Sequence, residues 1–197
     1  MSITTPRLLV AYATQGSEGQ TVQIAERLAA VLRESAALAD VVDCEKLPSD
    51  FRLSSYDGAI IGGSVRGGRY RRSLRRLLRG QRASLESLPW AFFSVCLAIA
   101  STREDSRAVA GKLPHQLLAR EGLAPREVAV FAGALRFSRH SRLGARILFR
   151  MNRGYLGRTE MEGDWEYTDW DEVEAFARRF LASLATDARS AVLRPSR

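Results

Sequence analysis

The 197-residue chain is 46% hydrophobic and 26% charged, which is typical of one globular domain and unlike a disordered protein. No apolar run approaches the roughly 18 residues needed to cross a membrane, and residues 1–7 lack the apolar core of a secretory signal, so we expect a cytoplasmic protein. The formal net charge of +8 favours anionic partners and argues against an electron carrier that docks on basic proteins, although a GC-rich genome would produce the same bias toward arginine.

Short apolar runs alternate with segments of helical periodicity along the chain. Strands are predicted at 7–13, 39–44, 56–63, 89–95 and 127–135, and helices at 21–33, 70–82, 106–120 and 169–184. Asp169 is predicted to cap the last helix, with Glu172 three residues later. This alternation predicts an α/β fold, a doubly wound five-stranded parallel sheet with helices on both faces, in a single domain over residues 1–185. We expect residues 186–197 to form a disordered tail.

Residues 136–166 do not fit this alternation and are too long for an idle loop. The segment contains arginines at spacings of three and four, which would form one stripe of a helix: Arg139, Arg142, Arg146, Arg150 and Arg153. Its apolar residues would spread over the rest of that helix: Leu143, Ile147, Leu148, Phe149 and Met151. Such a helix could lie on an anionic membrane surface. A helix packed on its own domain, with its arginines in solvent, would show the same pattern.

A polar loop with two glycines joins the first predicted strand to the first helix. Backbone N–H groups at that helix start, together with hydroxyl side chains, can bind a phosphate group. The loop lacks the Gly-Lys-Ser/Thr ending of a triphosphatase and the GxGxxG pattern of a dinucleotide site. A glycine-rich surface turn would look similar. The candidate phosphate-binding residues are Thr14, Gln15, Gly16, Ser17, Gly19, Gln20 and Thr21.

Two further loops follow the third and fourth predicted strands and would meet the first loop at the same edge of the sheet. Five strands with a ligand at the switch in strand order is the flavodoxin-like arrangement, so we expect a bound flavin. Gly67 and Gly68 would allow close backbone approach to the isoalloxazine ring, Tyr70 could stack on it, and Arg66 could stabilise the reduced ring or lie in solvent. The candidate ring-binding residues are Ser64, Val65, Arg66, Gly67, Gly68, Tyr70, Val95, Cys96, Leu97 and Ala98.

Catalytic side chains and metal ligands are not predicted. His115 and His140 are the only histidines and are too far apart in sequence for a histidine-based metal site. Cys44 and Cys96 lie in apolar, strand-like segments and are expected to be buried thiols. Any chemistry is therefore assigned to the cofactor.

Four stretches support a more specific interpretation: IGGSVRGGRY at 61–70, AFFSVCL at 91–97, FAGALRF at 131–137 and YTDW at 167–170. In this order they resemble the flavodoxin-fold protoporphyrinogen IX dehydrogenases that pass electrons to quinone. The insertion at 136–166 also resembles an extra loop of that family. The resemblance implies FMN as cofactor and oxidation of protoporphyrinogen IX to protoporphyrin IX, in porphyrin and heme biosynthesis. Six electrons would pass, in three two-electron rounds, to a respiratory quinone.

The resemblance further implies that Arg66, Arg136, Arg139 and Arg142 bind substrate carboxylates, and that the basic insertion contacts an anionic membrane surface. The protein would then be peripheral on the inner face of the cell membrane, with no nucleic-acid partner. Two departures are a phosphate loop longer than the family's and Gly67 in place of an aromatic residue. The alternatives are an NAD(P)H:quinone reductase, a flavodoxin-like electron carrier and a flavin-free interaction module.

Overall fold

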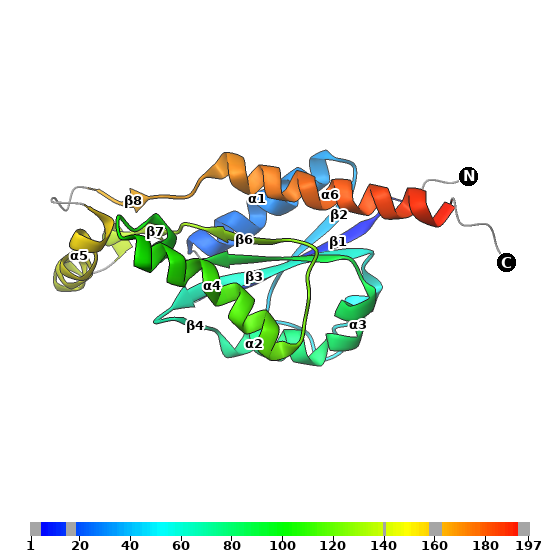
Figure 1. Ribbon diagram of the computed structural model, residues 1–197, viewed down its shortest axis with the longest axis horizontal. Coiled ribbons are helices and arrows are strands. Elements are labelled where there is room, and N and C mark those ends of the chain that lie inside the picture. The colour runs from blue at the N-terminus through cyan, green and yellow to red at the C-terminus, as the bar shows by residue number, and fades with distance from the viewer. Residues whose placement is uncertain (1–4, 15–18, 140, 158–162, 193–197) are drawn as a thin grey trace.

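A parallel sheet lies between two layers of helices in the computed structural model, which describes residues 5–14, 19–139, 141–157 and 163–192 (Figure 1). The strands β1 (Arg7–Ala13), β2 (Leu38–Asp43), β3 (Gly58–Arg66), β5 (Trp90–Val95) and β6 (Val128–Phe131) pair in parallel in the order β2-β1-β3-β5-β6. The doubly wound parallel sheet predicted from the sequence is therefore confirmed. The switch in strand order falls between β1 and β3.

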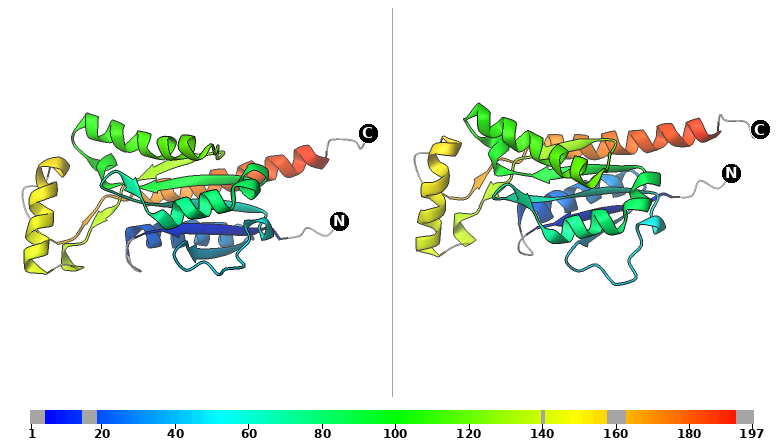
Figure 2. Two further views of the ribbon diagram at one scale, coloured as in Figure 1. Left: turned by 90° about the horizontal axis from the view of Figure 1, so that it is seen from below. Right: turned by 60° about the horizontal axis from the view of Figure 1, so that its bottom comes forward.

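Helices cover both faces of this sheet (Figure 2). One face carries α1 (Gln20–Glu34) and α6 (Trp170–Val192), and the other carries α2 (Arg72–Gly80), α3 (Arg82–Ser87) and α4 (Glu104–Glu121). Alternate residues of β1 enter the two cores, Leu8 and Val10 on the α1 side and Leu9 and Ala11 on the α2 side. Burial on both faces is why the parallel strands are continuously apolar.

Near the carboxyl end of β3, the backbones of the neighbouring strands leave no room for a side chain at Gly62 or Gly63. A Cβ atom added to Gly62 would lie 2.1 Å from the carbonyl oxygen of Phe93, and one added to Gly63 would lie 2.6 Å from that of Ala13. Glycine is required at these two positions because backbone atoms occupy the space of a side chain.

The region after β3 differs from the prediction of a loop followed by one helix. Strand β3 continues to Arg66 and forms a hairpin with the short antiparallel strand β4 (Arg69–Tyr70). The two turn residues, Gly67 and Gly68, have φ values of +55° and +72°, which a two-residue hairpin turn of this kind requires. The helix predicted at 70–82 corresponds to α2, and α3, which begins at Arg82, follows it where no helix was predicted.

The strand predicted at 127–135 is also divided. Strand β6 ends at Phe131, and β7 (Ala134–Leu135) leaves the sheet to pair antiparallel with β8 (Trp165–Glu166). This small second sheet brings together the two ends of the insertion at 136–166.

The last helix begins as predicted and ends later. The backbone N–H of Glu172 donates to Asp169 Oδ1 at 3.0 Å, which confirms the predicted cap. Helix α6 continues to Val192, so residues 186–192 are helical where a disordered tail is predicted. Residues 193–197 lie outside the described ranges.

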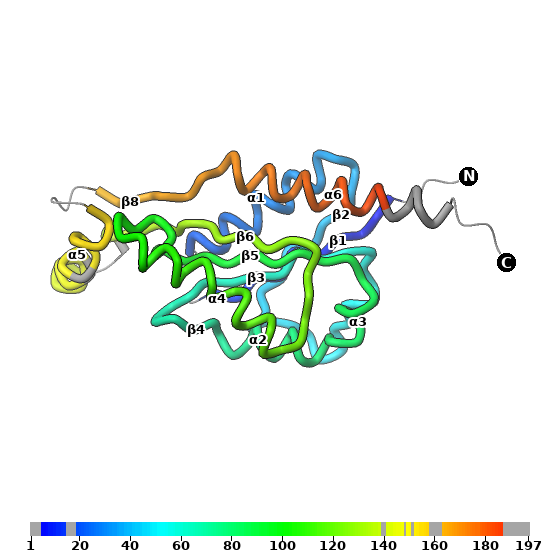
Figure 3. Tube along the Cα trace, in the orientation of Figure 1, coloured from blue at the N-terminus to red at the C-terminus, as the bar shows by residue number. Residues whose placement is uncertain are grey.

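The insertion forms helix α5 (Arg142–Leu156), which stands across the end of the molecule opposite the start of β1 (Figure 3). A small core supports it: Leu135, Phe137, Ala145, Leu156 and Trp165. Leu143 and Ile147 are 70% and 53% exposed on its outer side. The helix thus packs on its own domain and still presents apolar residues beside its arginines. The side chains of Arg139, Leu148 and Met151 lie outside the description.

Candidate functional site

The predicted phosphate loop lies where β1 meets α1. Thr14 and Thr21 are buried there, while Gln15, Gly16 and Ser17 lie outside the described residues. Helix α1 has Gly19 as N-cap, no side-chain cap and no acidic residue in its first turn. Its first N–H groups and the positive end of its dipole are therefore not neutralised by a described side chain, which suits a phosphate group.

Gln20 has a structural role that the sequence analysis missed. Its Nε2 donates to Glu166 Oε1 at 2.8 Å and to Thr168 Oγ1 at 2.9 Å, and its Oε1 accepts from Arg136 Nη2 at 3.0 Å. Thr168 in turn donates to the carbonyl of Ala132. The side chain of Gln20 thus ties β7 and β8 to the start of α1, and a ligand on the loop could be reached by its backbone N–H.

Arg136 belongs to the same hydrogen-bond network. Its Nη2 also donates to Glu166 Oε2 at 3.1 Å, and its side chain is only 29% exposed. The prediction assigns Arg136 to substrate carboxylates, but in the structure it is paired with acidic groups close to α1. Glu166 and Asp164 balance its positive charge, so its assignment to a substrate carboxylate stays a prediction.

A cavity of about 500 Å³ brings together most of the predicted ring-binding residues. The β3–β4 hairpin and the segment after β5 contribute Val65, Gly67, Gly68, Cys96, Leu97 and Ala98. Helices α4 and α5 complete the wall with residues that the sequence analysis did not single out, among them Asp105, Val109, Asn152 and Tyr155. The contribution of Asn152 and Tyr155 is visible only in the structure, because α5 is distant in sequence from the hairpin.

Backbone contacts hold α5 against the segment after β5, which forms the 3-10 turn η2 (Leu97–Ala100). The carbonyl of Tyr155 accepts from Ser101 Oγ at 2.8 Å and from the N–H of Thr102 at 3.1 Å. Leu97 and Ala100 pack against the small core of the insertion. The insertion therefore partly covers the segment after β5.

Burial keeps the thiols of the chain protonated. It raises the pKa of Cys96, at the cavity, and that of Cys44 to about 12. Both cysteines are free and buried, as predicted, and neither is a thiolate nucleophile near neutral pH. Asp105, on the same wall, forms an ion pair with Arg103, and hydrogen bonding to Arg103 lowers the pKa of Asp105 to about 2.

Tyr70 does not face this cavity. Its ring lies edge-on to Phe92 with centroids 5.9 Å apart, and its hydroxyl donates to Ser94 Oγ at 2.8 Å. Burial raises the pKa of this phenol. The ring is thus half-buried against the core and lines the cavity on the α2 side of the hairpin, so stacking of Tyr70 on a flavin stays a prediction that this arrangement does not support.

The other predicted ring-binding residues occupy different positions. Val95 is 5% exposed and packs in the core, so its backbone alone can reach a ligand. Ser64 lies with its Oγ 3.5 Å from Thr14 Oγ1, which links the first and second loops. Ser64 and Arg66 line a separate cavity on the α2 side of the hairpin.

The predicted substrate arginines lie on different elements. Arg66 is at the exposed end of β3, whereas Arg142 lines a cavity of about 720 Å³ with Arg146, Phe137 and Asp164. Only the backbone of Arg139 is described. The described residues contain no group of three or more His, Cys, Asp or Glu placed to hold a metal. None of the helices within the described ranges is long and apolar enough to cross a bilayer.

Comparison with known proteins assigns the chain to a family. Residues 9–160 match the flavodoxin domain model. The protoporphyrinogen IX dehydrogenase [quinone] of Escherichia coli K12 is 31% identical over 175 residues, which are 87% of this chain and 93% of that protein. The chain belongs to this flavodoxin-fold dehydrogenase family. A family member of the same name from Leishmania major is 29% identical over 183 residues, covering 92% of this chain and 78% of the relative.

Membership of the dehydrogenase family makes the chain an oxidoreductase. Solved structures of similar fold include a flavodoxin of Streptococcus pneumoniae TIGR4, with a TM-score of 0.48 and 17% identity over 90% of this chain and 99% of that one. Another is a Fusobacterium nucleatum flavodoxin variant bound to flavin mononucleotide, with a TM-score of 0.45 and 9% identity over 93% and 97% of the two chains.

Proposed function

We propose that this oxidoreductase binds FMN and oxidises protoporphyrinogen IX to protoporphyrin IX with a respiratory quinone as electron acceptor. The observation that carries the proposal is the cavity between the β3–β4 hairpin, η2 and α5. The folded insertion forms one wall of the cavity at which the cofactor chemistry would take place. The names of the relatives supply the substrate and acceptor.

The residues present fit FMN. The ends of β1, β3 and β5 are neighbours at one edge of the sheet, where adjacent strands are about 4.8 Å apart. The first N–H groups of α1, with Thr14 and Thr21, would hold the phosphate, and the hairpin and residues 95–98 would hold the ring. Bound FMN would supply two-electron redox chemistry.

The chain itself would bind and orient the substrate. In each of three rounds the porphyrinogen loses two electrons and two protons, and one quinone is reduced to a quinol. Cys96, Leu97 and Ala98 would present an apolar surface to the tetrapyrrole, while α5 shields the cavity from water. Arg66 and Arg142, which line two different cavities of the described chain, would attract its carboxylates.

A direct assay tests this function. The purified protein is incubated anaerobically with FMN, protoporphyrinogen IX and a quinone, and porphyrin fluorescence is expected to rise above the uncatalysed rate. No rise would contradict the proposal. Rapid bleaching of the flavin by NADPH would instead identify a reductase, an accumulating semiquinone would identify a carrier, and a protein that stays colourless with FMN would identify a flavin-free module.

Replacing Thr14 and Thr21 by valine is expected to weaken FMN binding by about 10- to 100-fold per residue. Valine keeps the shape of threonine and removes the hydroxyl, and a hydrogen bond to a charged group contributes about 1.5–3 kcal/mol. Titration of flavin fluorescence measures the effect. Thr186→Val, on the exposed side of α6, is the control. Unchanged affinity in both loop variants would place the phosphate elsewhere.

We also propose that the outer side of α5 contacts an anionic membrane surface. Leu143 and Ile147 are one turn apart and exposed, and exposed arginines flank them: Arg142, Arg146, Arg150 and Arg153. Apolar insertion and attraction to acidic lipids would act together, with about 1 kcal/mol from each arginine close to the surface.

The double variant Leu143→Asn/Ile147→Asn is expected to bind phosphatidylglycerol vesicles at least about 10-fold more weakly, because it removes the two side chains that would enter the lipid. Vesicle flotation measures binding. Leu38→Asn, which changes an equally exposed leucine in β2, is the matched control. If the wild type does not float, or the double variant floats equally well, this part of the proposal is wrong.

A further inference from the structure

The N-terminus of α2, like that of α1, has no capping side chain. Helix α2 begins at Arg72, its N-cap residue Arg71 makes no side-chain cap, and its first turn contains no acidic residue. The N–H groups of this turn and the helix dipole therefore favour a negative charge. A buried hydroxyl, a positively charged cavity and a neighbouring ring cavity lie at this helix end.

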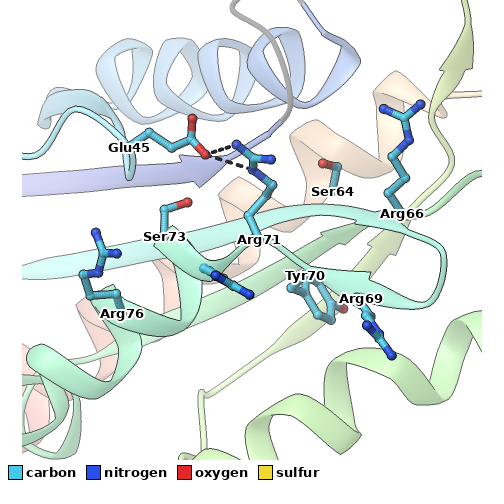
Figure 4. A pocket seen from close by; sticks show the side chains of 9 residues that line it. Glu45, Ser64, Arg66, Arg69, Tyr70, Arg71, Ser73 and Arg76 are labelled. Atoms are coloured by element: carbon cyan, nitrogen blue, oxygen red, sulfur yellow. Dashed lines mark hydrogen bonds and ion pairs between the residues drawn. The ribbon is translucent and has the colours of Figure 1, made fainter.

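The first observation is a buried hydroxyl without a partner. Ser73, in the first turn of α2, is 8% exposed, and its Oγ is buried with no hydrogen-bond partner. It lines a cavity of about 570 Å³, and Figure 4 shows the hydroxyl on the side of the helix that faces Glu45 and Arg71. An unsatisfied buried hydroxyl costs about 1–3 kcal/mol and is rare in native proteins, so the Ser73 hydroxyl favours a ligand that accepts a hydrogen bond here.

The second observation is the charge of the cavity. Five arginines line it: Arg66, Arg69, Arg71, Arg72 and Arg76. Its single acidic residue, Glu45, is already engaged, since its Oε1 accepts from Arg71 Nε at 2.8 Å. Within the part of the chain that the structure describes, Arg69, Arg72 and Arg76 form no ion pair. The cavity therefore carries a strong net positive charge.

The third observation is the position of the cavity. Ser64 and Arg66, on its wall, belong to β3, and the turn residues that follow, Gly67 and Gly68, line the cavity assigned above to the flavin ring. The two cavities thus adjoin one hairpin. A molecule that meets the ring could extend an anionic arm to α2.

We infer that the N-terminus of α2, with Ser73 and the adjacent arginines, is an oxyanion-binding site for a carboxylate or phosphate group of the redox partner. The hydroxyl of Ser73 and the first N–H groups of α2 donate to the oxyanion, and Arg72 and Arg76 balance its charge. A tetrapyrrole propionate as the source rests on the proposed function. The oxyanion site itself does not, because a phosphorylated nicotinamide nucleotide carries the same chemistry.

Equilibrium binding tests this site without turnover. The FMN-loaded protein is titrated with protoporphyrin IX, with its dimethyl ester, which lacks free carboxylates, and with adenosine 2′,5′-bisphosphate. Ser73→Ala is expected to weaken binding of one of the two anionic ligands about 5-fold. Ser73→Ala/Arg76→Gln is expected to weaken it about 20-fold. Binding of the dimethyl ester is expected to be the same in the wild type and the variants.

The ligand that responds identifies the source of the oxyanion. Arg120→Gln, at the end of α4 and outside the cavity, is the control for a changed net charge. Ser73→Ala is also expected to unfold at an equal or higher urea concentration than the wild type, because it removes an unsatisfied buried hydroxyl. Correct folding of the variant can thus be checked separately.

If neither anionic ligand responds more than in the Arg120→Gln control, the oxyanion site is refuted, even where porphyrinogen oxidation is observed. If only the nucleotide responds and porphyrinogen is not oxidised, the site stands and the proposed function fails. The two ideas are therefore tested independently.

Discussion

Gly62→Ala is expected to destabilise the fold by about 4 kcal/mol or more, which for most domains is a large share of the total stability. The added Cβ would lie 2.1 Å from the Phe93 carbonyl oxygen and 2.4 Å from Cδ1 of its ring. Both atoms belong to the fully buried centre of β5, which pairs with β3 at this residue. The strands can accommodate the methyl group only by separating, which breaks hydrogen bonds of the ladder. Urea denaturation followed by circular dichroism measures the loss.

Gly111→Ala is the matched control for this substitution. Gly111 lies inside α4, and nothing lies within 4 Å of an added Cβ. Because alanine restricts the unfolded chain and favours the helix, this variant is expected to gain about 0.5–1 kcal/mol. A Gly62→Ala protein within 1 kcal/mol of the wild type would mean that β3 and β5 are not packed as described.

Trp165→Ala is expected to release α5 from the sheet while leaving the main domain folded. The ring of Trp165 is 3% exposed and lies edge-on to Phe137, with centroids 4.8 Å apart, and to Phe149 at 5.7 Å. Truncating a buried tryptophan costs about 3–5 kcal/mol, which exceeds what the few remaining contacts of this small core can supply. Since α5 forms one wall of the ring cavity, porphyrinogen oxidation should fall at least about 10-fold.

Hydrogen exchange separates this local effect from global unfolding. Amides of α5 should lose protection in Trp165→Ala, while those of β1, β3 and β5 keep theirs. Trp165→Phe, which retains an aromatic ring in the cluster, should keep most of the activity. Full activity in Trp165→Ala, or equal loss of protection throughout the chain, would contradict the assigned role of the insertion.

The sequence predicts the elements whose signals are local. Buried parallel strands are continuous apolar runs, and α1, α4 and α6 show helical spacing, so their positions agree with the structure to within a few residues except at the end of α6. The pairing of β7 with β8 was not predicted, because its partners are about 30 residues apart and each is only two residues long. Periodicity carries no information about such distant pairs.

In the candidate site, too, local features were predictable and contacts between distant residues were not. Residues of the hairpin and of the segment after β5 were expected to meet because they follow neighbouring strands, and they line one cavity. The direction of Tyr70 was not predictable, since it depends on β4, where alternation turns Arg69 outward and Tyr70 toward Phe92. The network of Gln20 with Arg136 joins polar residues that are 116 positions apart, and nothing in their spacing marks them.

The pairing of Leu135 with Trp165 brings the two ends of the insertion together, because paired residues of antiparallel strands are about 5 Å apart. A segment with adjoining ends can be gained or lost as one piece without altering the register of the parent sheet. A short turn grafted across the same two positions is therefore expected to remove α5 and leave the parent sheet folded.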